Sequence, residues 1–184
     1  MGIMARNTNN KASKVKLSAV LALGTISWVS NIGTANISVL AQSSNQTTCD
    51  VHAFVIDKDP QGLNVRSTPG SSSKVLGKIP TNESLKIIAS SGNWVKITDA
   101  LSGFPGTGWV FLPMLNTSTR GYETNGVNLY ASPTQQSRKV GRVPRRTNVK
   151  LLGCKGQWAE VEYRGVKGWL MRNDQCGVAV TTCS

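Results

Sequence analysis

The chain has 184 residues and is strongly basic, with 21 Lys plus Arg against 9 Asp plus Glu and a formal net charge of +12. This charge predicts association with an anionic partner but does not identify it. The sequence contains one histidine, which excludes a hydrolytic site built on several histidines.

Residues 1–41 have the pattern of a secretory signal peptide. Four basic residues and no acid lie within the first 16 positions, and an apolar stretch follows at residues 15–29. Val39 and Ala41 stand where small residues precede a signal-peptidase cut. The apolar stretch is too short and too interrupted for a membrane span. We expect export to the periplasm or the cell exterior with cleavage near Gln42; an uncleaved N-terminal anchor is the alternative.

The rest of the chain contains an internal duplication. The segment GLNVRSTPG, which begins at Gly62, is similar to the segment GVNLYASPT, which begins at Gly126. Over residues 62–97 and 126–161, 9 of 36 positions are identical at an offset of 64. Such self-similarity indicates a repeated structural unit. We therefore expect four parts after the signal peptide: a short N-terminal segment at 42–49, domain 1 at 50–115, a polar linker at 116–122 and domain 2 at 123–184 with a cysteine-containing tail.

Each copy reads as short β-strands separated by turn residues. Apolar or alternating runs occur at residues 84–90 and 93–98, and their counterparts lie at 148–154 and 157–163. No stretch after residue 41 keeps a helical period for ten residues. About 60 residues of such strands predict a small barrel, so the expected fold is all-β, with two tandem small barrels and no large helix. Copy one has four extra residues in its last hairpin, in the sequence SGFPGTG.

All four cysteines follow the expected cleavage point, and an even number in an exported chain predicts two disulfides. Their spacing does not match a zinc site, where ligands come in close pairs. Of the three possible pairings, we expect Cys176 with Cys183, which leaves Cys49 with Cys154. No metal and no cofactor are expected.

The two halves differ in charge. Residues 50–115 hold 6 Lys plus Arg and 5 Asp plus Glu, whereas residues 120–184 hold 11 and 4. Arg145 and Arg146 lie in the densest basic stretch and are candidate anion-binding residues. His52, the one histidine, has no partner constellation in the sequence. We therefore expect no catalytic residues and no enzyme activity.

The motifs of both copies resemble bacterial SH3-type (SH3b) domains. Copy one reads GLNVRSTPG, then GNWVKI, then GWV, which is the order of the family's motifs. Copy two keeps Asn128, Pro133, Trp158 and Trp169 but has Tyr130 where the family usually has Arg. The resemblance implies SH3-like barrels that bind cell-wall peptidoglycan, most often attached to a hydrolase that this sequence does not show.

Four residues are the candidate ligand contacts in the barrels: Arg66, Trp94, Tyr130 and Trp158. Arg66 could hold a loop by hydrogen bonds to carbonyls, or bind a ligand carboxylate through two parallel hydrogen bonds. Tyr130 cannot form this bidentate contact, so we expect the two copies to have diverged in binding. The tryptophans could stack on a sugar or an apolar side chain, although packing within the barrel is the simpler interpretation.

The expected partner is peptidoglycan or another anionic envelope polymer. The alternative is a secreted protein–protein adaptor that uses its peptide-binding barrels and the SGFPGTG loop. A nucleic-acid partner fits the high pI, but export and the nearly neutral first copy argue against it.

Overall fold

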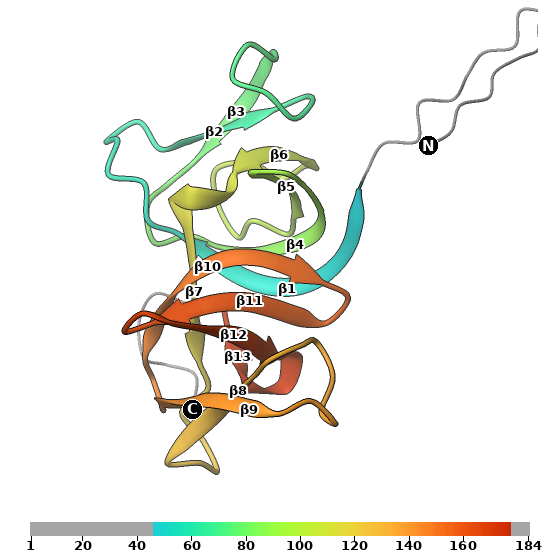
Figure 1. Ribbon diagram of the computed structural model, residues 1–184. Coiled ribbons are helices and arrows are strands. Elements are labelled where there is room, and N and C mark those ends of the chain that lie inside the picture. The colour runs from blue at the N-terminus through green and yellow to red at the C-terminus, as the bar shows by residue number, and fades with distance from the viewer. Residues whose placement is uncertain (1–45, 178–184) are drawn as a thin grey trace, which may run out of the picture. The chain divides into compact units, whose positions relative to one another are not determined.

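The computed structural model describes residues 46–177, which form thirteen β-strands and two short 3-10 turns (Figure 1). The expected all-β fold is confirmed. No helix in this part of the chain is long and apolar enough to cross a membrane. The expected signal peptide lies outside the described residues, so its cleavage stays a prediction.

Copy one consists of six strands that pair in antiparallel fashion. They are β1 (Thr47–Val55), β2 (Leu63–Arg66), β3 (Val75–Ile79), β4 (Ser84–Ser91), β5 (Trp94–Thr98) and β6 (Gly108–Phe111), followed by the 3-10 turn η1 (Leu112–Met114). Their spatial order is β3-β2-β6-β5-β4-β1.

Copy two repeats this arrangement. Its strands are β7 (Leu115–Thr119), β8 (Gly126–Tyr130), β9 (Lys139–Pro144), β10 (Asn148–Lys155), β11 (Trp158–Tyr163), β12 (Val166–Met171) and β13 (Gln175–Cys176), with the turn η2 (Arg172–Asp174). The order β7-β10-β11-β12-β8-β9 mirrors that of copy one.

The long strands β4 and β10 are bulged at equivalent positions. The pairing of β4 with β5 skips Ile88, and the pairing of β10 with β11 skips Leu152, which lies 64 residues later. A bulge bends its strand and increases the local twist. These two bulges help each copy to curl into a barrel.

Alternation along the strands builds the core. In β5, Val95 and Ile97 are buried while Trp94 and Lys96 are partly exposed, as expected for a strand with one face toward the core. Fully buried aliphatic side chains from both copies form one apolar cluster, which includes Val65, Ile79, Ile87, Leu129, Val143 and Leu151.

The segment expected as a linker, residues 116–122, is in fact largely strand. Residues 116–119 belong to β7, whose side chains at Thr117 and Thr119 are buried. β7 pairs with β1 of copy one and with β10 of copy two. Its polar composition misled the sequence interpretation because the hydroxyl groups have partners: the Thr119 hydroxyl donates to the Pro144 carbonyl at 2.7 Å.

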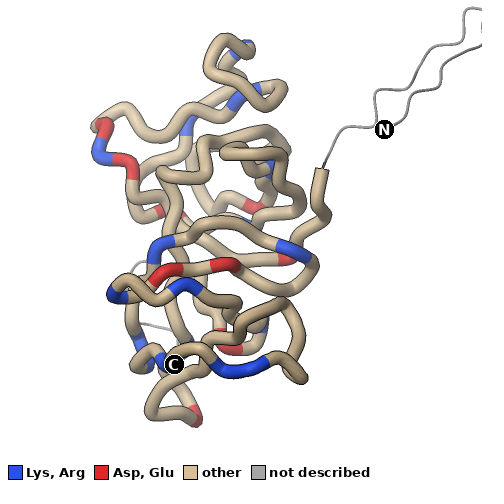
Figure 2. The backbone as a smooth tube through the Cα atoms, viewed as in Figure 1, with Lys and Arg blue, Asp and Glu red and all other residues tan. Residues whose placement is uncertain are grey.

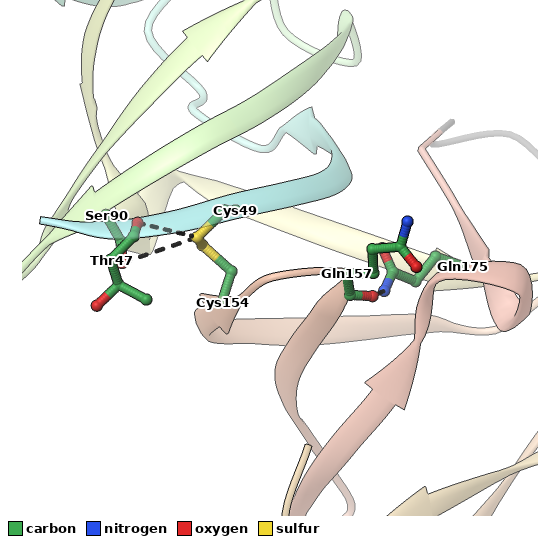
Figure 3. Close-up of a disulfide and its surroundings, with 6 residues drawn as sticks. All are labelled: Thr47, Cys49, Ser90, Cys154, Gln157 and Gln175. Carbon is green, nitrogen blue, oxygen red and sulfur yellow. Dashed lines mark hydrogen bonds between the residues drawn. A yellow bond between two sulfur atoms is a disulfide. The ribbon is translucent and has the colours of Figure 1, made fainter. Parts of the chain in front are cut away.

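The two copies are also joined covalently. Cys49 in β1 forms a disulfide with Cys154 in β10, as the sequence predicted (Figure 3). The two half-cystines are 4% and 6% exposed, and the bond closes a loop of 105 residues. Cys176 is not a free cysteine, whereas Cys183 lies outside the described residues, so the pairing of Cys176 with Cys183 stays a prediction.

Candidate functional site

Barrel one carries a pocket of about 270 Å³ that brings together two of the predicted site residues, Arg66 and Trp94. Phe111 and Met114 add apolar surface to its wall, and Asp57 adds a carboxylate. Each of these five side chains is partly exposed. We refer to this site as the barrel-one pocket.

The aromatic wall of the pocket follows from strand pairing. Trp94 begins β5 and lies directly opposite Phe111 at the end of β6. Their ring centroids are 5.5 Å apart and the planes are tilted by 53°. Cross-strand aromatic pairs of this kind stabilise a sheet. The pair therefore offers a rigid apolar surface whose position is fixed by the sheet.

Arg66 ends β2 next to a bulge in the neighbouring strand. Val65 pairs with Gly77, and Arg66 pairs with Val75, so the register shifts at this point. Bulges next to binding sites commonly redirect a side chain. The Arg66 Nη1 donates to the Ser73 carbonyl at 2.7 Å, which holds the loop that follows β2. Both sequence-based roles are therefore open to Arg66: one nitrogen anchors the loop, and Nε and Nη2 have no hydrogen-bond partner among residues 46–177.

Asp57 lies in the segment between β1 and β2 and also lines the pocket. Its Oδ1 accepts a hydrogen bond from the backbone N–H of Asp59 at 3.0 Å. Asp59 in turn accepts from the N–H of Gln61 at 2.8 Å, so two successive Asx-type turns fix the segment.

The equivalent position in barrel two is built differently. Tyr130 packs edge-on against Trp158 with ring centroids 5.5 Å apart and planes at 84°. Trp158 lies opposite Met171, the counterpart of Phe111, so the aromatic partner comes from β8 instead of β12. Gln135, the counterpart of Ser71, donates from its Nε2 to the Met171 Sδ at 2.6 Å. The change from Arg66 to Tyr130 therefore belongs to a coordinated repacking of the site.

Arg145 and Arg146 do not join the Tyr130–Trp158 pair. Tyr130 pairs with Lys139 at the start of β9, whereas the two arginines follow the end of that strand. At about 3.3 Å per residue, roughly 20 Å of chain separates them. Both are exposed, and no salt bridge involves either within the described part of the chain. Figure 2 shows basic residues along β9 and its neighbouring turns.

His52 lies in a second pocket, of about 460 Å³, with Lys86, Asp99 and Arg172. Burial, assisted by the nearby positive charge of Arg172, lowers the pKa of His52 below its ordinary value of 6.5. The Asp50 carboxylate bridges the Lys86 ammonium at 3.1 Å, and this contact lowers the pKa of Asp50.

This second pocket has no arrangement suited to nucleophilic catalysis, because a base, a nucleophile and an orienting group must lie within hydrogen-bond distance. No hydrogen bond from His52 to another side chain is present within residues 46–177. Nor does any group of three His, Cys, Asp or Glu side chains there have the geometry to hold a metal ion.

Six residues that line the barrel-one pocket were missed by sequence reasoning, and three of them shape its chemistry most: Asp57, Phe111 and Met114. Asp57 differs between the copies, since its counterpart is Gly121, and this difference was a usable signal. Phe111 and Met114 end a strand and a 3-10 turn, and their proximity to Trp94 depends on strand register.

The family described as bacterial SH3 domain matches two segments of the chain, residues 61–115 and 125–173. A protein of Bacillus subtilis (strain 168) named as an N-acetylmuramoyl-L-alanine amidase, YrvJ, is 30% identical over 135 residues, which are 63% of this chain and 25% of that protein. The chain thus spans a quarter of that relative's length. The cell wall-binding protein YwsB of the same organism is 26% identical over 179 residues, which are 90% of this chain and 97% of that protein.

Two solved structures show a low overall similarity. NlpC2 from Trichomonas vaginalis has a TM-score of 0.31 at 13% identity, over 69% of this chain and 48% of that chain. An NlpC/P60 family protein from Bacillus cereus has a TM-score of 0.28 at 14% identity, over 68% and 55%.

Proposed function

Because the chain belongs to the bacterial SH3 domain family, we propose that it is an exported, non-catalytic binding module that attaches to cell-wall peptidoglycan. The observation that carries this proposal is the barrel-one pocket, where the Trp94–Phe111 pair and Arg66 line the same space and only the Nη1 of Arg66 is used in a hydrogen bond among the described residues. Peptidoglycan combines sugars with short peptides that contain carboxylates. Aromatic faces suit the apolar surfaces of such a ligand, and a guanidinium suits its carboxylates.

The extent of similarity to YwsB supports the same conclusion. That relative is named a cell wall-binding protein, and the similarity runs over nearly the whole of both chains. A chain built mainly of two barrels is consistent with a binding role for the barrels themselves. The similarity to YrvJ covers only a quarter of that protein, so its name contributes less.

The exposed basic residues of barrel two contribute a second, less specific attraction. Arg138, Lys139, Arg142, Arg145 and Arg146 are all exposed. Attraction between exposed charges is screened over about 8–10 Å at physiological salt. We therefore assign these residues to the approach of the protein to an anionic wall, and the barrel-one pocket to selection of the ligand.

One observation favours the alternative, a secreted protein–protein adaptor. Leu101 is 82% exposed, at the beginning of the loop that is longer in copy one than in copy two. This side chain gives the alternative a possible contact point on a copy-specific loop, but a single exposed leucine is common on protein surfaces and is weaker support than a contiguous apolar patch. Leu101 lines the pocket that contains His52 and is not among the residues that line the barrel-one pocket.

The test is co-sedimentation of the chain from Gln42, which retains every described residue, with purified peptidoglycan stripped of its anionic polymers. We expect pelleting that persists at 0.5 M NaCl. Trp94→Ala is expected to weaken it by about tenfold or more, since a central tryptophan often contributes 2 kcal/mol or more to binding. Trp158→Ala is the matched variant in barrel two and is expected to have a smaller effect, because Tyr130 stands there in place of Arg66 and no guanidinium accompanies the ring.

Two results would overturn the proposal. One is pelleting that disappears at moderate salt in the unaltered protein, which would reduce the interaction to nonspecific charge attraction. The other is undiminished pelleting of Trp94→Ala and Arg66→Ala, which would remove the pocket from the interaction. Circular dichroism of each variant verifies that the barrels remain folded.

A further inference from the structure

The barrel-one pocket presents both a positive and a negative side chain to a ligand. Arg66 and Asp57 line the same pocket, yet no salt bridge joins them among the described residues, where such pairs are formed only by Asp50 and Asp174. Both side chains are partly exposed, so water satisfies them in the free protein. A ligand that carries both charges would replace this water with two charge-assisted hydrogen bonds.

Each of the two charged groups is held in place by one backbone hydrogen bond and retains further bonding capacity. Arg66 uses Nη1 for the Ser73 carbonyl, and Asp57 uses Oδ1 for the Asp59 N–H. Within residues 46–177 no partner is present for Nε or Nη2 of Arg66, or for Oδ2 of Asp57. Side chains fixed in this way lose little conformational entropy on binding.

The size and walls of the pocket limit the ligand further. At about 270 Å³ it is smaller than the 300–1,000 Å³ of pockets that enclose drug-sized molecules. It can hold one amino acid or a similar fragment, and the rest of a longer ligand would lie outside it. Trp94, Phe111 and Met114 supply the apolar surface, which suits an aliphatic segment between the charged groups and the rest of the ligand.

Barrel two provides an internal comparison. The counterpart of Arg66 is Tyr130, and the counterpart of Asp57 is Gly121, so both charges are absent together. The aromatic element is retained, because Trp158 keeps the place of Trp94 and contacts Tyr130. An aromatic surface is therefore common to both barrels, and the pair of opposite charges belongs to barrel one alone.

We propose that the barrel-one pocket binds a zwitterionic α-amino acid group, an ammonium and a carboxylate on one carbon, carried on an aliphatic stem. Arg66 receives the carboxylate, Asp57 receives the ammonium, and the stem lies against Trp94 and Phe111. This inference rests on the proposed function and specifies it: the peptides of the wall polymer are recognised where they bear a free α-amino acid group.

Three small probes separate the two charges. Norleucine has both charges and a straight aliphatic chain, N-acetylnorleucine retains only the carboxylate, and norleucinamide retains only the ammonium. Binding to the chain from Gln42 is followed by the NMR signal of the Trp94 indole N–H, assigned with Trp94→Phe. We expect norleucine to bind at least tenfold more tightly than either blocked probe, because a hydrogen bond to a charged group contributes more than a neutral one.

Asp57→Asn is the decisive variant, because its amide oxygen can still accept from the Asp59 N–H. It is expected to abolish the preference for norleucine over N-acetylnorleucine. Asp59→Asn, which makes the same charge change outside the pocket, is the matched control and is expected to retain the preference. If the unaltered protein binds norleucine and N-acetylnorleucine equally, zwitterion recognition is refuted and the pocket is a carboxylate site. If it binds norleucine and norleucinamide equally, zwitterion recognition is refuted and the pocket holds an ammonium group on the aromatic pair.

The outcome also distinguishes the two proposals. If none of the probes shifts the Trp94 signal while peptidoglycan still pellets the protein in a Trp94-dependent way, the zwitterion proposal is wrong and the wall-binding proposal stands. If norleucine binds as expected but peptidoglycan does not pellet the protein, the pocket recognises free amino acids or peptides and the wall-binding proposal is wrong.

Discussion

Removal of the disulfide between Cys49 and Cys154 is expected to destabilise the protein strongly. The bond closes a loop of 105 residues. The chain-entropy model for a loop of that length gives a stabilisation of about 4.7 kcal/mol at 25 °C, and measured values typically lie at about 2–4 kcal/mol. The double variant Cys49→Ala with Cys154→Ala removes the bond without leaving a free thiol. We therefore expect the free energy of unfolding to fall by about 3–5 kcal/mol.

Urea unfolding followed by tryptophan fluorescence measures this change, with the slope of the transition as an internal check. Ser90→Ala is the control, because the Ser90 Oγ lies 3.9 Å from the Cys49 Sγ and its removal leaves the bond intact. A loss below 1 kcal/mol in the double variant would refute the reasoning. It would mean that residual structure already restricts the reduced unfolded chain, so that the disulfide removes little further conformational entropy from it.

Three further outcomes follow from the described contacts. Because burial lowers the pKa of His52, the unfolded chain takes up a proton near pH 6.5 more readily than the folded one, so the free energy of unfolding should fall as the pH decreases below about 6.5. His52→Gln should reduce this fall in urea titrations at pH 7.5 and 5.5. An unchanged pH dependence in the variant would mean that the carboxyl groups cause the fall. A Cβ at Gly108 would lie 2.4 Å from a Val65 methyl carbon, so Gly108→Ala should lower the free energy of unfolding by about 1–3 kcal/mol in thermal or urea unfolding. A change near zero would show that β2 can move away from the added methyl group. Replacing Arg145 and Arg146 with Ala should weaken pelleting with unstripped cell walls at 50 mM NaCl but not at 0.5 M, and equal loss at both salt concentrations would indicate a direct ligand contact.

The duplication, the all-β class and the Cys49–Cys154 pairing could be predicted because they depend on local patterns and on a small number of alternatives. The strands at residues 84–90 and 148–154 alternate clearly and are β4 and β10 in the structure. β7 could not be predicted, because its sequence LNTST is polar and its burial depends on pairing with strands of both copies. Tertiary context outweighs β-propensity at such positions.

The candidate site was predicted in part. Arg66 and Trp94 meet in one pocket, and Tyr130 meets Trp158, but Arg145 and Arg146 lie apart from both. The sequence shows which residues carry charge or an aromatic ring. It does not show which of them come together, because that depends on strand register and on bulges such as the one next to Arg66.

The position of the disulfide determines how a pulling force would pass through the protein. Tension applied between the two ends of the chain would travel along the backbone to Cys49, cross the sulfur–sulfur bond to Cys154 and leave through the remaining residues. Residues 50–153, including the whole of the barrel-one pocket, lie in the bypassed loop and would carry no covalent load. A force between the two ends of the chain would thus leave that pocket outside the covalent path, whereas a force between one end and a ligand held in the pocket would still pass through the residues of the loop.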